Sequence, residues 1–308
     1  MNYKKMKNKK ITSFLELLIV WKKSWKLHFF DFWGFENRNE SVKKILKESL
    51  SDTKIPDFKP VIINTWDRPF NKCFNVNVFS FCTADWYKDK ILPDFLYDSW
   101  EAAKIPDFDV ITEELIWAWE KKPKINKIWR IWNCETSPSR KVLENLWKHY
   151  PKYLDIRNSA QKWTKWMSLH ELVETYWYLL DVEWRWWSAR LKLLLFSWRP
   201  VFVQERKWKD HVISLLEPYK HYIPVKNDFS DFIEKIEKYF DSDLAFEIWK
   251  NWQKFSMEEL NKDKAYHYIY SEFLNLKKIN YNNIKIFIVI LIRIVKKCFE
   301  YGKSMLKK

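Results

Sequence analysis

Hydrophobic and polar positions along this chain follow two different periods, and together they predict a mixed α/β protein. Apolar residues recur at intervals of three and four through residues 1–50, in FLELLIV and again in SVKKILKESL, which predicts helices. Short apolar runs follow at residues 61–64 (VIIN) and 75–81 (NVNVFSF), and these are typical of strands. The segment ITEELIWAWEKK returns to helical spacing, with acidic residues in its first turn that favour the helix dipole.

A second half of the chain begins near Lys124, where the pattern restarts as a strand, a loop and a helix. KINKIWRIWN predicts the strand, and CETSPSR opens the helix KVLENLWKHY with residue types suited to a helix start. Strands and helices then alternate from KYLDIR through YWYLLDVE and RPVFVQ to HYIPV, which predicts a doubly wound sheet. We expect an N-terminal domain over residues 1–122, a second domain over 123–275, and a basic, apolar helix over 276–308.

Tryptophan and glycine occur in inverted proportions. An ordinary chain holds roughly 7% glycine, whereas this chain of 308 residues holds 2 Gly and 21 Trp. Some bacteria read the UGA codon as glycine and others as tryptophan, so translation with the wrong code exchanges these two residues alone. We expect many Trp positions to be glycine in the native protein; the alternative is a genuinely Trp-rich chain. Tight turns, often with positive φ, are expected at Trp66, Trp86, Trp132, Trp184, Trp198 and Trp252.

Net charge indicates which partners the protein binds, and cysteine usage indicates its cellular compartment. The formal net charge of +15 favours anionic partners such as nucleotide phosphates or acidic lipids, and simple solubility is the alternative. Because the basic residues are not gathered in one RNA-binding motif, we expect no nucleic-acid partner. The 4 cysteines form no CxxC pair, which fits a reduced, cytoplasmic compartment. The 6 histidines include no pair at the i, i+4 spacing of a helical zinc site, so we expect no metal.

Two apolar stretches bear on contact with a membrane. Residues 11–20 (ITSFLELLIV) contain Glu16 and are too short to span a bilayer, so we expect no secretory signal there. Residues 284–295 are apolar but interrupted by Lys285 and Arg293, as in a buried or interfacial helix. Basic flanks at both ends favour peripheral contact with the inner face of an anionic membrane. An amphipathic helix packed on the protein's own domains is the alternative.

The most specific pattern lies in residues 176–231. It reads YWYLLDVE, WRWWSARLK, RPVFVQ and HYIPVK in that order, after the upstream blocks IINTWDRPF, FSFCTADWYKD and RIWNCETSPSR. This order resembles glycosyltransferase family 90, whose members modify lipopolysaccharide or act as protein O-glucosyl- and O-xylosyltransferases. The resemblance covers roughly residues 55–275. It departs from the family where glycine is replaced by Trp184, Trp186 and Trp198.

The resemblance implies a GT-B type fold, in which two Rossmann-like domains face each other across a cleft and a C-terminal helix crosses back. It also implies an inverting, metal-independent enzyme without a cofactor, which moves glucose or xylose from a UDP-sugar to a surface glycan or lipopolysaccharide-like acceptor. Asp67 matches the family's catalytic base, and a turn aspartate that caps its own backbone is the alternative. The implied cleft residues beside it are Arg68, Ser80, Thr83 and Asp85.

Donor binding is implied for a second group of residues. A glycine-permitted loop before a helix N-terminus suits a phosphate, and the guanidinium group of arginine suits a diphosphate. An ordinary capped helix and an ordinary strand edge are the alternatives for these blocks. The implied donor-binding residues are Thr136, Ser137, Arg140, Glu183, Ser188, Arg190, Lys192, Tyr222 and Val225.

Two further interpretations concern metals and stacking. The run DSD at residues 241–243 mimics an Asp-x-Asp metal motif, but it precedes LAFEIW and is expected to cap that helix. A non-catalytic, aromatic-rich protein that binds glycans or nucleic acid is the alternative function. It requires genuine tryptophans, because exposed indoles stack on sugars and bases.

Overall fold

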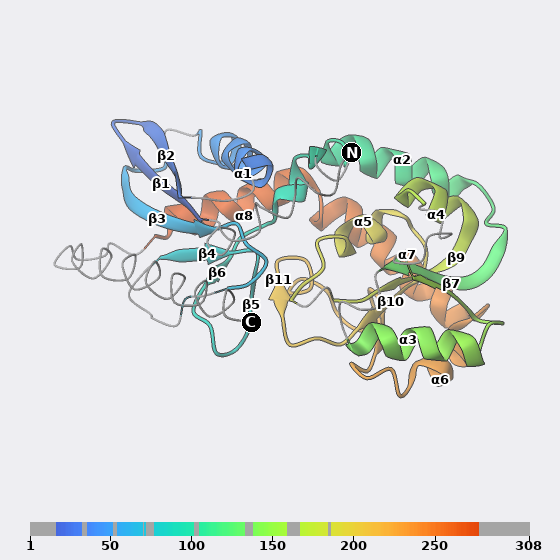
Figure 1. Ribbon diagram of the computed structural model, residues 1–308. Helices are drawn as coiled ribbons and strands as arrows, with labels where there is room; N and C mark the ends of the chain where they lie inside the picture. Colours follow the sequence, from blue (N-terminus) through green and yellow to red (C-terminus); the bar gives the residue numbers. More distant parts are fainter. Residues whose placement is uncertain are drawn as a thin grey trace, which may run out of the picture. The chain divides into compact units, whose positions relative to one another are not determined.

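The computed structural model describes residues 17–32, 36–51, 54–69, 71, 77–101, 105–132, 138–158, 167–183 and 186–276. The chain divides into two compact units (Figure 1): unit 1 comprises Met1–Phe95 and Tyr266–Lys308, and unit 2 comprises Leu96–Ala265. Both units combine helices with parallel strands, which confirms the α/β class. These units are defined by packing, and the functional boundary near residue 122 stays a prediction.

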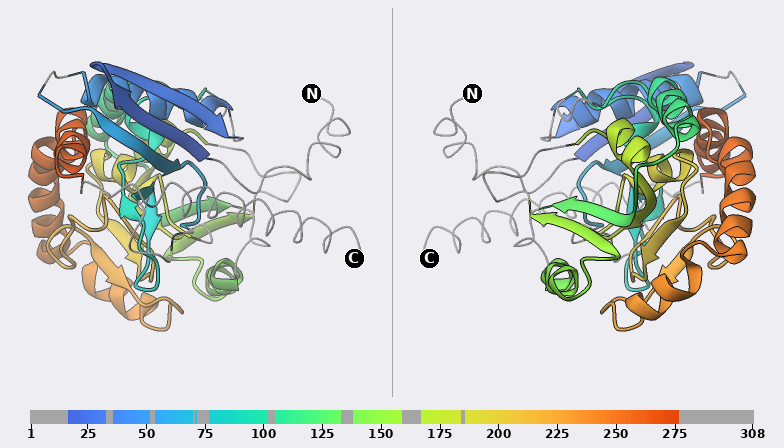
Figure 2. Two further views of the ribbon diagram at one scale, coloured as in Figure 1. Left: turned by 90° about the vertical axis from the view of Figure 1, so that its left-hand side faces the viewer. Right: turned by 90° about the vertical axis from the view of Figure 1, so that its right-hand side faces the viewer.

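Unit 1 is built on a mixed sheet with the strand order β2-β1-β3-β4-β6. Its first strand pairs antiparallel with the second and the third, and the remaining neighbours run parallel (Figure 2). The strands are β1 (Leu17–Lys23), β2 (Lys26–Phe32), β3 (Phe58–Asn64), β4 (Val78–Ser80) and β6 (Lys90–Ile91). The short β5 (Cys82–Thr83) lies between β4 and β6 along the chain but is not part of this sheet. The α-helices in the described part of this unit are α1 (Glu36–Ser49) and most of α8 (Lys262–Leu274).

The helix predicted at the start of the chain is wrong over residues 17–32, which form the hairpin β1–β2. Leu18, Val20 and Lys22 alternate as buried positions along β1, as expected of a strand with one face on the core. An apolar run of this length fits either a strand or a helical turn, so periodicity alone did not decide. The later part of the same prediction is confirmed, because SVKKILKESL lies in α1 and the residue that follows it.

The two strands predicted next are confirmed as β3 and as the shorter β4. Helix α8 packs on this sheet, because Phe273 stacks on Phe79 with ring centres 5.2 Å apart. Lys90 also pairs with Glu272 at 2.9 Å. The predicted helix over residues 276–308 lies outside the described residues, apart from Leu276. None of the helices in the described part of the chain combines the length and apolar character that a bilayer span requires.

Unit 2 contains a 5-stranded sheet with the order β12-β10-β9-β7-β8, in which every neighbouring pair is parallel. The strands are β7 (Ile125–Trp132), β8 (Leu154–Asn158), β9 (Tyr176–Asp181), β10 (Val201–Gln204) and β12 (Ile223–Val225); β11 (Lys209–Asp210) lies outside this sheet. The helices are α2 (Phe108–Glu120), α3 (Pro138–His149), α4 (Leu169–Thr175), α5 (Leu191–Phe196), α6 (Phe232–Tyr239) and α7 (Asp243–Glu259).

Helices cover both faces of this parallel sheet, as a doubly wound fold requires. Figure 1 shows α2, α4 and α5 on one side, and α3 and α6 on the other. Tyr178, Leu180 and Val182 point to the side of α3 and α6, where they join a fully buried core with residues of those helices and of α7. The doubly wound sheet predicted for this half is therefore confirmed.

The strand order of unit 2 reverses beside β7. The chain first places β8 on one side of β7 and then returns to the other side for β9. Where the order of parallel strands reverses, the connections leave toward opposite faces, and a crevice opens outside the carboxyl ends of the strands. In unit 2 that position lies at the ends of β7 and β9.

The expected placement of tryptophans at tight turns is confirmed in part. Trp198 directly follows the C-cap residue of α5 and has a φ of 49°. Trp66 lies in a bend and Trp86 in a turn, although neither has a positive φ. The prediction is wrong for Trp132, the last residue of β7, and for Trp252, which lies within α7. Trp184 lies outside the described residues.

Candidate active site

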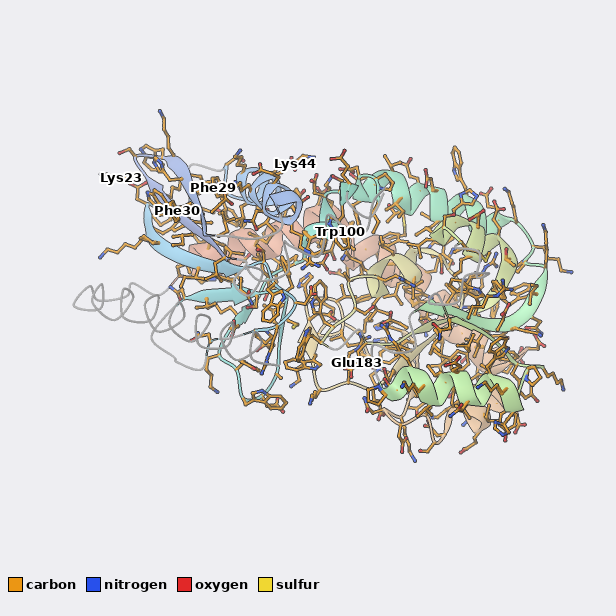
Figure 3. The ribbon with its side chains drawn as sticks, viewed as in Figure 1. Lys23, Phe29, Phe30, Lys44, Trp100 and Glu183 are labelled. Carbon is orange, nitrogen blue, oxygen red and sulfur yellow. The ribbon has the colours of Figure 1, made fainter. Side chains whose placement is uncertain are left out.

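Arg140 and Glu183 meet where the strand order of unit 2 reverses. Arg140 is buried in the first turn of α3, the helix that follows β7, and Glu183 follows β9. Arg140 Nη2 donates to the carbonyl oxygen of Glu183 across 3.5 Å. Figure 3 labels Glu183, which lies beside one end of α3. These two residues, both predicted to bind the donor, therefore come together at the position where such sheets bind ligands.

Asp181, the last residue of β9, gathers two more of the predicted residues. Its carboxylate is fully buried and accepts hydrogen bonds from Ser188 Oγ at 2.6 Å and from Arg206 Nη2 at 2.7 Å. Burial lowers the pKa of Arg190, and the negative charge of Asp181 acts against that effect. Ser188 is thus bound to this carboxylate, Arg190 lies within electrostatic range of it, and Arg190 remains a cation at neutral pH.

Two residues at the end of β10 complete this cluster in unit 2. Gln204 accepts a hydrogen bond from the backbone N–H of Glu183 at 3.3 Å and donates to the carbonyl of Asn227 at 2.8 Å. The side chain of Arg206 is only 2% exposed. Burial alone would lower the pKa of Arg206, but Asp181, Asp210 and Glu183 raise it above its ordinary value. The ion pair between Arg206 and Asp181 is therefore held away from water.

Glu183 is the second acidic residue of this cluster. Burial raises the pKa of its carboxyl group, and the positive charges of Arg206, Lys207 and Arg140 act in the opposite direction. A carboxyl group that is removed from water lacks the hydrogen bonds that water would donate to it. It can accept a hydrogen bond from a hydroxyl group of a ligand instead.

The remaining predicted donor-binding residues divide into four cases. Burial raises the pKa of Tyr222, and the charge of Arg206 opposes this, so the phenol lies within electrostatic range of the cluster. Val225 is buried at the end of β12, and its carbonyl accepts a hydrogen bond from Glu205 N at 2.7 Å. Lys192 contacts other groups: its Nζ donates to the carbonyl of Ala189 at 3.1 Å and lies 5.0 Å from the centre of the Tyr97 ring. Thr136 and Ser137 lie outside the described residues.

In unit 1, Asp67 lies in the turn after β3, as its sequence position predicts. Its carboxylate accepts a hydrogen bond from Arg38 Nη1 at 2.8 Å, and the side chain is 14% exposed. Arg38 comes from α1, is itself buried, and also donates to the carbonyl of Thr65 at 3.3 Å. The carboxylate of Asp67 is therefore oriented by a different element rather than by its own turn.

Hydrogen bonds also connect the predicted cleft residues of unit 1 to this turn. Asn64 Nδ2 donates to the carbonyl of Arg68 at 2.8 Å and to Ser80 Oγ at 2.9 Å. Ser80 Oγ donates to Asp89 at 2.6 Å, and Arg68 Nε donates to the Tyr87 hydroxyl at 3.1 Å. Arg68 and Ser80 thus lie with Asp67 at the carboxyl ends of β3 and β4. Further along the chain come Thr83, which ends β5, and Asp85, which lies in the following turn.

Sequence reasoning did not single out Arg38, Asp181 or Arg206. Asp181 ends an apolar strand and Arg206 follows one, at the edge of a parallel sheet where ligands bind, and that rule could have identified them. Arg38 carries no such signal, because it lies in the polar run ENRNES and its role depends on packing.

The structure also bears on the Asp-x-Asp motif. Ser242 is the N-cap residue of α7, and its side chain accepts a hydrogen bond from Ala245 N at 3.3 Å, which confirms the capping interpretation. Within the described ranges, no group of three or more His, Cys, Asp or Glu side chains is placed to hold a metal ion.

Comparison with known proteins agrees with the resemblance carried by the sequence blocks. Protein O-glucosyltransferase 1 of Rattus norvegicus is 26% identical over 264 residues, which cover 74% of this chain and 64% of that protein. The Homo sapiens protein of the same name is also 26% identical over 264 residues, which again cover 74% of this chain and 64% of that protein. Protein O-glucosyltransferase 3 of Homo sapiens is 30% identical over 96 residues, 31% of this chain and 19% of that protein. The chain thus spans less than two thirds of the length of these relatives. The model of the family described as "Glycosyl transferase family 90" matches residues 7–285, and the chain belongs to that family.

Proposed function

We propose that this protein is an inverting glycosyltransferase that moves a sugar, glucose or xylose, from a UDP-sugar to a hydroxyl group of a glycan. Family membership and the O-glucosyltransferase names of the relatives support transfer of a sugar. The observation that carries the proposal is the meeting of Arg140 and Glu183 at the reversal of strand order in a parallel sheet. Surface glycans and lipopolysaccharide-like saccharides are the proposed acceptors.

Unit 2 is the proposed site of the donor. Departure of UDP places negative charge on the diphosphate, and preorganised cations stabilise such a leaving group. Arg140 and Arg190 supply two guanidinium groups, which bind phosphate oxygens in a directed way. Thr136, Ser137 and Ser188 add hydroxyl donors in this proposal. The stabilisation comes from protein cations, so the proposed reaction needs neither a metal ion nor a cofactor.

Asp67 is the proposed base. Its carboxylate takes the proton from the acceptor hydroxyl, whose oxygen attacks the anomeric carbon while the bond from that carbon to the UDP oxygen breaks. Attack on the face opposite the leaving group inverts the configuration of the anomeric carbon. Arg38 holds the Asp67 carboxylate through the 2.8 Å ion pair. The proposal includes a GT-B arrangement, with the acceptor on the Asp67 domain and UDP on the other.

Release of UDP tests this function. The chain, recoded with glycine where tryptophans replace the family's glycines, is incubated with UDP-glucose or UDP-xylose and oligosaccharide acceptors. We expect UDP release and a loss of about 100-fold or more in Asp67→Asn, because an amide cannot take the proton. Asp57→Asn is the control: Asp57 lies in the same unit, where it accepts hydrogen bonds from the β1–β2 turn, and its loss should leave turnover unchanged. Full turnover in Asp67→Asn would contradict the assignment of the base.

A non-catalytic glycan-binding protein is the alternative class. Exposed indoles favour it, because Trp25, Trp86 and Trp117 are 65%, 48% and 70% exposed. They lie on three separate elements, whereas a stacking platform needs neighbouring rings. Intact UDP-sugar with every acceptor, together with saturable binding of an oligosaccharide, would favour this alternative over the transferase.

A peripheral position at the inner face of a membrane completes the proposal. Its support is the basic composition of both ends of the chain, at KKMKNKK and KKCFEYGKSMLKK. Sedimentation of the protein with anionic vesicles, but not with neutral ones, is the expected result. Equal recovery with both kinds of vesicle would remove this part of the proposal.

A further inference from the structure

Three buried polar atoms beside the donor-binding residues have no hydrogen-bond partner among the described residues. They are Nε and Nη1 of Arg206 and Oε2 of Glu183. The third nitrogen of the same guanidinium group, Nη2, is already bound to Asp181 at 2.7 Å. The two side chains are close enough for their charges to act on each other. Buried polar groups in folded proteins are nearly always paired, so two donors and one acceptor left over in one place need an explanation.

A purely structural role does not explain this arrangement. Each unsatisfied buried group costs a protein about 1–3 kcal/mol. Arg199, also buried in unit 2, shows what a structural arginine does: its Nε and Nη2 donate to the carbonyl oxygens of Val173, Trp119 and Lys121. Arg206 instead donates one nitrogen to Asp181, and its other two nitrogens have no partner in the part of the chain that the structure describes, as is also true of Oε2 of Glu183.

The position of the pair points to a ligand rather than to packing. Glu183 follows β9 and Arg206 follows β10, and these two strands are neighbours in the parallel sheet. The backbone N–H of Glu183 is fixed by Gln204, and its carbonyl accepts a hydrogen bond from Arg140. The pair therefore lies at the carboxyl ends of the strands, next to the arginine proposed to meet the diphosphate.

We propose that Arg206 and Glu183 bind the UDP-sugar itself, Arg206 donating to oxygen atoms of the donor and Glu183 accepting from one of its hydroxyl groups. This inference rests on the proposed function. A nucleoside diphosphate sugar offers phosphate oxygens as acceptors close to ribose and sugar hydroxyls as donors, which matches the atoms left over on the protein. Asp181 is the positioning residue, because it holds the Arg206 guanidinium through Nη2 and Ser188 through its other oxygen.

Glu183→Gln provides the main test, because a binding role and a structural role predict different results. The amide keeps the shape of the side chain and removes a buried carboxyl group, so the melting temperature should stay the same or rise. Affinity for UDP-glucose, measured by calorimetry on the full-length chain, should fall by roughly tenfold or more. A structural role predicts unchanged affinity.

Arg206→Lys provides the second test. Lysine keeps the positive charge and can still pair with Asp181, but its ammonium cannot place donors where Nε and Nη1 lie. Affinity for UDP-glucose should again fall by roughly tenfold, whereas a residue that only neutralised Asp181 would be replaced by lysine without loss. Parallel titrations with UDP separate contacts to the nucleotide, which weaken both ligands, from contacts to the sugar, which weaken UDP-glucose alone.

Arg199→Lys is the matched control for both variants. It should lower the melting temperature and leave the affinity for both ligands unchanged, because Arg199 donates to backbone carbonyls of α2 and α4, away from the cluster. Wild-type affinity in both Glu183→Gln and Arg206→Lys would overturn this inference and leave the proposed function intact. A wild-type chain that binds neither UDP nor UDP-glucose would overturn the proposed function, and this inference with it.

Discussion

Trp25 and Trp198 both have a left-handed backbone, with φ of 67° and 49°. Trp25 is the second residue of the two-residue turn between β1 and β2, and Ser24 before it has a φ of 50°. A turn with positive φ at both central positions is a type I′ turn, in which glycine is strongly preferred at the second. Trp198 follows the C-cap residue of α5, where helices most often place glycine.

We predict that Trp25→Gly stabilises the chain. A residue with a Cβ atom destabilises the folded state by about 1 kcal/mol when its backbone is left-handed, and glycine does not. Trp25 is 65% exposed, so its removal leaves little packing to lose. The free energy of unfolding, measured by urea denaturation, should rise by up to about 1 kcal/mol.

Trp117→Gly is the matched control for this prediction. Trp117 is equally exposed, at 70%, but lies within α2, where the backbone is right-handed and glycine costs about 0.5–1 kcal/mol. Opposite signs for the two substitutions would trace the effect to backbone geometry. A loss of stability in Trp25→Gly would contradict the role of backbone geometry. A tryptophan at this position in mass spectra of the native protein would contradict the expectation that this residue is glycine.

Arg38 is predicted to affect catalysis through Asp67. Arg38→Met removes the 2.8 Å ion pair and frees the carboxylate to rotate, so kcat for UDP release should fall by roughly 10- to 100-fold. Arg38→Lys should recover part of the loss, because it restores a charge without the directed hydrogen bond.

Lys43→Met is the control on the same helix. Lys43 also forms ion pairs, with Asp31 and Glu40, but Asp67 is not among them. Turnover should therefore match the wild type. Equal losses of kcat in the Lys43 and Arg38 variants would assign both to α1 as a whole, against a specific role of Arg38.

The incorrect prediction of a helix over residues 17–32 has a local cause. A hairpin is signalled in a sequence by Asn-Gly, Ser-Gly or a similar pair between two apolar runs. Here the turn residues are Ser24 and Trp25, so the sequence contains no such turn-forming pair. The run LLIVWKKSWKLHFF therefore suits one helix as well as two strands. The same composition that suggests misread glycines thus explains why the hairpin was missed.

The elements of unit 2 were predictable because their signals do not depend on glycine. Alternating strands and helices predict the doubly wound sheet. The order of the blocks singles out Arg140 and Glu183, which are in contact, Ser188, which donates to Asp181, and Arg190, which lies within electrostatic range of Asp181. The partners Asp181 and Arg206 could not be paired from sequence, because their 2.7 Å ion pair depends on which strands are neighbours.

Arg199 joins two helices, and its loss is predicted to loosen both. Its donors meet the carbonyl oxygens of Trp119 and Lys121 at the end of α2 and of Val173 in α4, at 2.9 to 3.3 Å. The last carbonyls of a helix have no partner within it, so these bonds complete the end of α2. Arg199→Met should lower the free energy of unfolding by roughly 1–3 kcal/mol, because it leaves the buried carbonyl of Val173 unpaired and removes the partly buried bonds to Trp119 and Lys121.

Hydrogen exchange locates this effect. In Arg199→Met, amides in the last turn of α2 and in α4 should exchange faster, whereas those of β10 should change only with global stability. Uniformly faster exchange across unit 2 would show that Arg199 supports the whole unit rather than these two helices.

At the scale of the whole molecule, burial of ionisable groups makes stability depend on pH. His211 is 6% exposed and lies edge-on to Tyr97, with ring centres 6.3 Å apart. Burial, helped by the charge of Lys192, lowers the pKa of His211 to about 4. In the unfolded chain the same imidazole has a pKa of about 6.5. The folded state therefore holds His211 neutral over a range in which the unfolded state is protonated.

The sign of the effect follows from linkage. Because folding lowers the pKa, the stabilising contribution of neutral His211 is complete above about pH 6.5 and is lost as the pH falls from there toward 4. The free energy of unfolding should decrease over this range by up to roughly 3 kcal/mol from this residue. His211→Gln cannot be protonated, so the difference between wild type and variant should shrink as the pH falls. Carboxylates titrate in both proteins. Burial raises the pKa of Asp155, but hydrogen bonds from Arg157 and Tyr176 bring it below its ordinary value, and this contribution cancels in the difference. A difference that stays constant from pH 7 to pH 4 would show that His211 is charged, or hydrated, in the folded protein.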